Sequence, residues 1–223
     1  MDIINEALAR GRTALSEHNS KRFLAGFSIP VSLETIASDA DSAVTEALKI
    51  GFPIVLKASG ENLFHKTEVE GIVLNITSEE EIRKESHRLL KVQGSEALLV
   101  QEMITGDREL VCGLTRDTQF GPCVMFGLGG IFTEILKDVS FRLAPLEERD
   151  ALEMMGEIKA HKILDAVRGM EPADRGTLTN MLINVGKIGL ENDAVKEIDI
   201  NPVIISGSRP VAADALVVLQ PAT

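Results

Sequence analysis

Short apolar runs alternate with amphipathic stretches along the first hundred residues, a pattern typical of mixed helix and sheet folds. Four of these runs predict strands, which cover residues 29–36, 52–58, 71–76 and 97–104. Between them, apolar positions at helical spacing predict helices over 39–50 and 79–92. Ser78 and Glu81 form a capping box at the start of the second helix. Residues 21–100 are therefore expected to form one α/β lobe.

The pattern changes after residue 100. Two apolar strands over 108–117 and 121–128 flank a turn with Asp117 and Gly121, which predicts an antiparallel hairpin. Further strands are expected over 135–146, 195–206 and 209–219, and helices over 3–15, 16–26, 146–158, 159–168 and 173–189. Residues 1–20 together with 101–223 are expected to form a second lobe of α+β type. A ligand site is expected where the two lobes meet, since such clefts are common pocket locations.

Composition excludes several classes of protein. The 223 residues carry a net charge of −11, the opposite of the basic footprint of a nucleic-acid binder. Aromatic residues make up 4% and include no Tyr or Trp, which argues against base-stacking platforms. The two cysteines, Cys112 and Cys123, lie in apolar runs, so a reducing cytoplasm is the simplest expectation. No apolar run is long enough to span a membrane, and the N-terminus does not resemble a signal peptide.

Two cationic positions and a histidine stand out in the first lobe. Lys57 ends a buried strand, where an isolated charge is costly unless an anion meets it. A phosphate contact would explain it, and so would a buried stem whose ammonium reaches water. His65 and Lys66 lie in a polar loop between two strands. The imidazole could act in acid–base chemistry, carry a phosphoryl group, or simply lie on the surface. Metal ligation is poorly supported, because no second His or Cys lies at ligand spacing.

A strand end and a glycine turn suggest a nucleotide. The strand end comprises Gln101, Glu102, Met103 and Ile104. Its backbone could bond the edge of a purine, or it could be an ordinary strand end. Glu109 is suited to a ribose hydroxyl or to pairing with Arg108. Gly129 and Gly130, in GLGG, would let the backbone approach phosphate, or form a bulge or tight turn. The run lacks the G-x-G-x-x-G fingerprint, so a Rossmann site is rejected.

Polar side chains on the closing strands predict a metal site. Glu197, Asp199 and Asn201 are spaced two residues apart and so point to one face of a strand. Asp214, in the next strand, could lie across from them. Carboxylate and amide oxygens are ligands that Mg²⁺ prefers when it holds nucleotide phosphates. The alternative is an Asn-Pro turn with solvated acids.

Arg142 lies between apolar neighbours on a strand of alternating pattern. A guanidinium suits phosphate recognition through its paired donors. The alternative is an ion pair with one of the many carboxylates.

In chain order, these segments resemble the ATP-grasp family and, within it, the β subunits of ADP-forming acyl-CoA (acetyl-CoA) synthetases, relatives of succinyl-CoA synthetase. The resemblance covers nearly the whole chain. Its most specific stretches are GFPIVLKA, HKTEVEGIVLNI, QFGPCVMFGLGGIFTEILKDVSFRLAPL and EIDINPV. It implies a two-lobed ATP-grasp fold that holds ATP or ADP with Mg²⁺. One departure is Glu70, where the family more often has glycine.

The resemblance also implies roles for individual residues. Lys57 matches the lysine on the ATP phosphates, residues 101–104 the adenine-side hinge, and Glu109 the ribose-side acid. The family's metal-holding set is matched by Asp199, Asn201 and Asp214. His65, in the HK[ST] loop with Lys66, matches the histidine proposed to accept the phosphoryl group. Arg142 matches an element of the family pattern, and a catalytic role is expected for it.

The implied reaction is acyl-CoA + ADP + phosphate ⇌ carboxylic acid + CoA + ATP, which runs through acyl phosphate and phosphohistidine. In the family, the CoA-binding modules belong to an α subunit or a fused segment. This chain is therefore expected to be the nucleotide half of a hetero-oligomer. The alternatives are a stand-alone ATP-grasp carboxylate ligase and a non-catalytic nucleotide-binding subunit.

Overall fold

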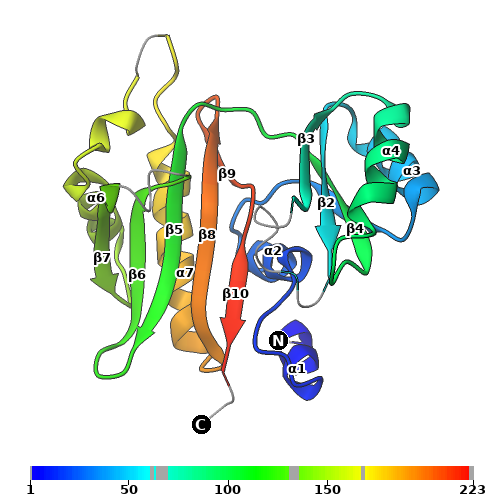
Figure 1. Ribbon diagram of the computed structural model, residues 1–223. Coiled ribbons are helices and arrows are strands. Elements are labelled where there is room, and N and C mark those ends of the chain that lie inside the picture. The colour runs from blue at the N-terminus through cyan, green and yellow to red at the C-terminus, as the bar shows by residue number, and fades with distance from the viewer. Residues whose placement is uncertain (1, 61–62, 64–69, 131–135, 167–168, 221–223) are drawn as a thin grey trace. The chain divides into compact units, whose positions relative to one another are not determined.

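The computed structural model describes residues 2–60, 63, 70–130, 136–166 and 169–220. The chain divides into two compact units, each with its own sheet (Figure 1). Unit 1 comprises Met1–Leu15, Ser20–Val31 and Ile104–Thr223, and unit 2 comprises Ser16–Asn19 and Ser32–Met103.

Unit 2 is built on a four-stranded antiparallel sheet of order β1-β4-β2-β3. Its strands are β1 (Glu34–Ala37), β2 (Ile54–Ser59), β3 (Ile72–Ile76) and β4 (Ala97–Glu102). Helices α3 (Ala40–Ile50) and α4 (Glu79–Leu89) share a core with one face of this sheet. Leu56 and Val100 belong to that core. Because strand residues alternate, Lys57 and Gln101 lie on the opposite face.

The helix starts in unit 2 follow from local hydrogen bonds. Ser78 caps α4 as predicted, since its hydroxyl accepts from the N–H of Glu81. The carboxylate of Glu81 accepts from the N–H of Thr77 at 2.8 Å. The first bond satisfies an amide group that the first helical turn cannot pair internally. The second bond differs from the predicted capping box, because Glu81 binds Thr77, the residue before the N-cap.

Unit 1 contains a six-stranded sheet of order β10-β8-β5-β6-β7, with β9 paired to β8. Its strands are β5 (Glu109–Asp117), β6 (Gly121–Leu128), β7 (Val139–Leu143), β8 (Val195–Ser206), β9 (Arg209–Ala212) and β10 (Leu216–Leu219). Its helical segments are α1 (Asp2–Ala9), part of α2 (Glu17–Ala25), α6 (Glu148–Glu157), the 3₁₀ turn η1 (His161–Leu164) and α7 (Arg175–Glu191). The predicted hairpin is confirmed, because β5 and β6 pair antiparallel down to Asp117 and Gly121.

One face of the unit 1 sheet carries the core. Cys112, Val124 and Ile200 belong to this core, together with Met154 of α6 and Val185 of α7. Figure 1 shows α7 running along the back of the sheet and α6 beside β7. The residues that alternate with the core positions therefore point to the other face of the sheet.

Two sequence expectations differ from the structure for identifiable reasons. The helix expected over 3–15 ends at Ala9, because Gly11 adopts a φ of +71° and the chain then pairs with β10. The N–H of Leu15 donates to the carbonyl of Val217 at 2.9 Å. Of the helix expected over 159–168, the described residues form only the 3₁₀ turn η1.

The two units also run over different ranges from the expected lobes. Residues 20–31 were expected mainly in the first lobe, yet they belong to unit 1. Phe23, Leu24 and Ile29 are buried in the unit 1 core, which explains the assignment. None of the helices in the described part of the chain is both long and apolar enough to cross a membrane.

Candidate functional site

The open face of the unit 1 sheet carries the predicted metal set. Glu197, Asp199 and Asn201 alternate along β8 with the buried Ile198 and Ile200. The three polar side chains therefore share the face opposite the core, as their spacing predicted. They line a cavity of about 300 Å³. Its wall is completed by other side chains of the same sheet, among them Val111, Thr115, Met125 and Phe141.

Negative charge is concentrated at this cavity. Burial, and after it the nearby charges of Glu197 and Asp214, raise the pKa of Asp199 to about 6. Asp214 lies just before β10, in which Leu216 pairs with Asp199. A cation held among these carboxylates would offset both the lost hydration and the mutual repulsion.

The donor set fits a hard divalent cation only if the amide takes part. Within the described ranges, no three His, Cys, Asp or Glu side chains form a metal-binding group by themselves. The predicted set of Asp199, Asn201 and Asp214 instead combines two carboxylates with an amide oxygen. Mg²⁺ commonly takes one or two protein carboxylates and completes its shell with waters and phosphate oxygens. The residues present therefore fit that ion.

The glycine turn holds the amide in place. The N–H of Gly130 donates to Oδ1 of Asn201 at 2.9 Å, which leaves a second lone pair on that oxygen. Gly130 has a φ of +60°, and a Cβ added there would lie 1.9 Å from Oε2 of Glu109. The N–H of Gly129 donates to the carbonyl of Glu109 at 2.9 Å. The run thus forms a tight turn that brings Glu109 beside Asn201, while its phosphate contact stays a prediction.

Arg108 is committed to the fold. Its buried guanidinium donates to four backbone carbonyls, those of Ile163, Asp165, Glu171 and Gly207. The suggested pairing of Glu109 with Arg108 therefore gains no support from the geometry.

Lys57 is buried in unit 2. Its side chain is 6% exposed, and its Nζ lies 2.6 Å from Oε1 of Glu17, whose side chain is 4% exposed. The alternative of an ammonium that reaches water is therefore wrong. His18, which follows Glu17 on α2, has its Nδ1 3.0 Å from Oε1 of Glu34 on β1. Sequence reasoning missed Glu17, because an acid at a helix start is ordinarily explained by the helix dipole.

The predicted hinge begins on β4. Gln101 is buried on the same sheet face as Lys57. The Glu102 carboxylate accepts from the N–H of Leu33 at 2.6 Å, and the N–H of Met103 donates to the carbonyl of Pro53 at 3.2 Å. Ile104 begins the next segment of unit 1. The adenine role of these residues stays a prediction.

His65 and Lys66 lie outside the described residues, so their predicted roles stay predictions. Glu70, at the end of the same loop, is described. It has a φ of +52°, a left-handed conformation that favours glycine, and its carbonyl accepts from Arg88 at 2.7 Å. The glycine expected from the family resemblance would suit this backbone.

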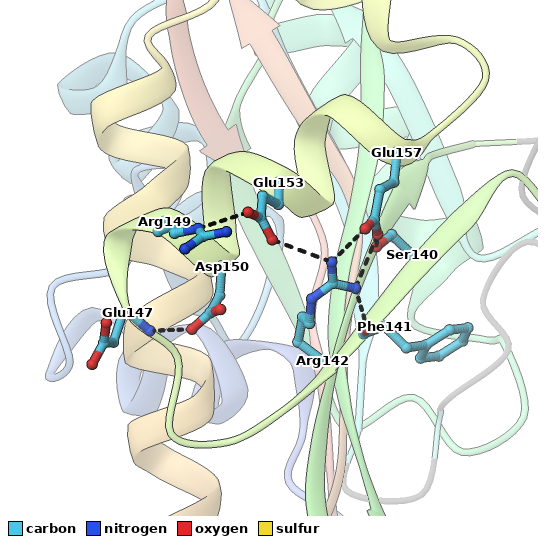
Figure 2. Close-up of polar contacts among 8 residues, drawn as sticks. All are labelled: Ser140, Phe141, Arg142, Glu147, Arg149, Asp150, Glu153 and Glu157. Carbon is cyan, nitrogen blue, oxygen red and sulfur yellow. Dashed lines mark hydrogen bonds and ion pairs between the residues drawn. The ribbon is translucent and has the colours of Figure 1, made fainter.

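Arg142 is not brought together with the metal set. It alternates on β7 with Phe141, which lines the cavity, and it points instead to the side of α6 (Figure 2). There its guanidinium donates twice to the Glu157 carboxylate, which also accepts from the Ser140 hydroxyl at 2.6 Å. Hydrogen bonds from Arg142, and then from Ser140, lower the pKa of Glu157. The ion-pair alternative is therefore what the geometry supports, and a catalytic role stays a prediction.

Comparisons with known proteins identify the family of this chain. The model of the ATP-grasp domain matches residues 6–219. The β subunit of acetate–CoA ligase (ADP-forming) II from Pyrococcus furiosus is 41% identical, over 99% of this chain and 98% of its own. In Archaeoglobus fulgidus, acetate–CoA ligase (ADP-forming) II is 38% identical over 92% of this chain, which matches 30% of that longer protein.

A solved structure extends the comparison to three dimensions. Acetyl-coenzyme A synthetase 1 of Ca. Korarchaeum cryptofilum, in complex with coenzyme A and Mg-AMPPCP, contains a chain that matches with a TM-score of 0.88. The identity is 43%, over 98% of this chain and 99% of that one, whose phosphohistidine segment points towards the nucleotide binding site. The expected fold class is thereby confirmed. This chain belongs to the ATP-grasp family, among the β subunits of ADP-forming acetate–CoA ligases.

Proposed function

We propose that this chain is the nucleotide-binding β subunit of an ADP-forming acyl-CoA synthetase. In the direction of ATP formation, the P–N bond of a phosphohistidine breaks and a β-phosphate oxygen of ADP takes the phosphoryl group. The observation that carries the proposal is that Asp199 and Asn201 line one cavity on the open sheet face. The N–H of Gly130 binds Asn201, and Gly130 lies against the Glu109 carboxylate.

The donor set would hold Mg²⁺ through Asp199, Asn201 and Asp214. When bound there, Mg²⁺ would neutralise charge on the nucleotide phosphates. Asn201 is oriented for this by the bond from Gly130, and the burial and carboxylate repulsion that raise the pKa of Asp199 favour a cation. Glu109 lies at the same turn and would accept a hydrogen bond from the ribose.

Two residues of unit 2 would complete the transfer. Lys57 would place an ammonium on the phosphates, since a fixed cation offsets the repulsion between two anions. His65 would carry the phosphoryl group, because a neutral imidazole is a nucleophile at pH 7. Both assignments rest on the sequence resemblance.

A CoA-binding α subunit is the proposed partner. The Archaeoglobus relative is a single chain of which this protein matches 30%, so most of that ligase lies in other segments. We place the complex in the cytoplasm, in agreement with the free thiols of Cys112 and Cys123.

The test combines this chain with a candidate CoA-binding subunit, acetyl-CoA, ADP, phosphate and MgCl₂, and measures ATP. Asp199→Ala and His65→Ala should each reduce ATP formation by at least about a hundredfold, because Asp199 would hold the Mg²⁺ and His65 would carry the phosphoryl group. Asp193→Asn, an exposed carboxylate, should leave the rate unchanged.

Phosphoryl transfer through the histidine is tested by labelling with radioactive ATP. Acid-labile, base-stable label should appear in the wild type and be absent from His65→Ala. Full ATP formation by His65→Ala would overturn the carrier role. ATP-dependent ligation by this chain alone would favour a stand-alone ligase, and nucleotide binding without any turnover would favour a regulatory subunit.

A further inference from the structure

Lys21 is among the largest side chains in the described structure that are essentially fully buried, with 1% of its surface exposed. It lies on α2, in the part of that helix that belongs to unit 1. Burying an ammonium costs several kcal/mol unless strong hydrogen bonds compensate for the lost hydration. A lysine in this environment therefore calls for an explanation, and none of the proposed nucleotide or metal contacts uses it.

The ammonium binds the chain beside a proposed metal ligand. Nζ of Lys21 lies 3.1 Å from the carbonyl oxygen of Ala213, the residue before Asp214. The N–H of Ala213 in turn donates to the carbonyl of Pro202 at 3.0 Å, and Pro202 follows Asn201. One hydrogen-bonded pair of residues thus joins the segments that carry Asp214 and Asn201. Lys21 binds the carbonyl of Ala213 in that pair.

We propose that Lys21 is a positioning residue for the metal site. By fixing the Ala213 carbonyl, it sets where Asp214 leaves β9 relative to Asn201 of β8. This inference rests on the proposed function, because it assumes that Asp214 and Asn201 bind the cation of the nucleotide. Groups that orient metal ligands in this way typically change metal affinity by about tenfold to a hundredfold when removed.

Ser20 provides a matched control on the same helix. It is buried, and its hydroxyl accepts from the N–H of Val217 at 3.1 Å. It therefore attaches α2 to β10, three residues beyond Asp214, without contacting Ala213. A residue that merely holds α2 against the sheet should behave like Ser20.

The experiment measures metal binding directly in the whole chain. Mn²⁺ affinity is measured by electron paramagnetic resonance in the presence of ADP, and ADP affinity by calorimetry with MgCl₂ and with EDTA. Lys21→Met should weaken Mn²⁺ binding by at least about tenfold, while ADP affinity in EDTA stays within about twofold. Ser20→Ala should lower the unfolding temperature without changing the Mn²⁺ affinity.

Lys21→Gln keeps a shorter hydrogen-bond donor, so it should bind Mn²⁺ with intermediate affinity, and it decides the question if Lys21→Met does not fold. A folded Lys21 variant with wild-type Mn²⁺ affinity would overturn the inference, as would an equal loss in Ser20→Ala. If the wild type itself binds ADP equally with MgCl₂ and with EDTA, the proposed function fails as well, and the two failures are thereby distinguished.

Discussion

Replacing Asp199 by Asn should stabilise the metal-free protein while removing its metal site. The pKa of Asp199 is raised from its ordinary value of 3.8 to about 6, chiefly by burial and then by Glu197 and Asp214. The unfolded chain therefore ionises this carboxyl more readily than the folded protein does. At pH 7.5 that difference corresponds to about 3 kcal/mol of lost stability. Asn keeps the shape of the side chain and carries no charge to bury.

The sign of the pH dependence follows from the raised pKa. As the pH falls from 6 towards 3.8, folded Asp199 binds its proton before the unfolded chain does, so the wild type gains stability relative to Asp199→Asn. In urea unfolding with EDTA, the free energy of unfolding of Asp199→Asn should exceed that of the wild type by about 2–3 kcal/mol at pH 7.5. The difference should fall to about half of that at pH 5 and to little at pH 4.

The exposed carboxylate of Asp193 provides the control. Its side chain is 82% exposed, so Asp193→Asn should change the free energy of unfolding by no more than about 0.5 kcal/mol. An Asp199→Asn protein that is no more stable than the wild type at pH 7.5 would refute the reasoning. So would an advantage that stays the same at pH 4, because it could not then arise from ionisation of this carboxyl.

Three further substitutions probe the other polar contacts. Gly130→Ala places a Cβ against the Glu109 carboxylate at a left-handed φ. Calorimetry should therefore show ADP binding weakened by at least about tenfold, and unchanged affinity would contradict a nucleotide-binding role for this turn. Glu17→Ala removes the carboxylate beside buried Lys57, and urea unfolding should show a loss of about 3 kcal/mol, whereas a loss below about 0.5 kcal/mol would show the pair to be dispensable. Glu70→Gly relieves a φ of +52° and should raise stability by about 1 kcal/mol, with a lower unfolding temperature as the contrary result.

Local patterns were enough to predict the strands that carry the site. The alternation of Glu197, Asp199 and Asn201 with Ile198 and Ile200 set both the strand and its polar face before any tertiary contact was known. This works because the side-chain period of a strand is two residues, and a buried face leaves no freedom of register. Strand β2 followed equally from its continuous apolar run.

Contacts between distant segments could not be read from the sequence. Lys57 meets Glu17 across 40 residues, and the four carbonyls that Arg108 binds lie 55 to 99 residues away from it. Arg142 shows the same limit in another form. Alternation places Arg142 and Phe141 on opposite faces of β7. Which of the two side chains points to the cavity depends on where α6 packs. Propensity and spacing carry no information about such packing.

The acidity of the site links its stability to its ligand. The chain has a net charge of −11, and at the cavity part of that charge is Asp199, whose ionisation opposes folding. A ligand that binds only the folded state stabilises it by about 2.7 kcal/mol at one hundred times its dissociation constant. This is close to the cost of ionised Asp199 at neutral pH. Magnesium nucleotide at such a concentration would therefore return the stability that the empty site gives up, and Asp199→Asn would lose this dependence on nucleotide.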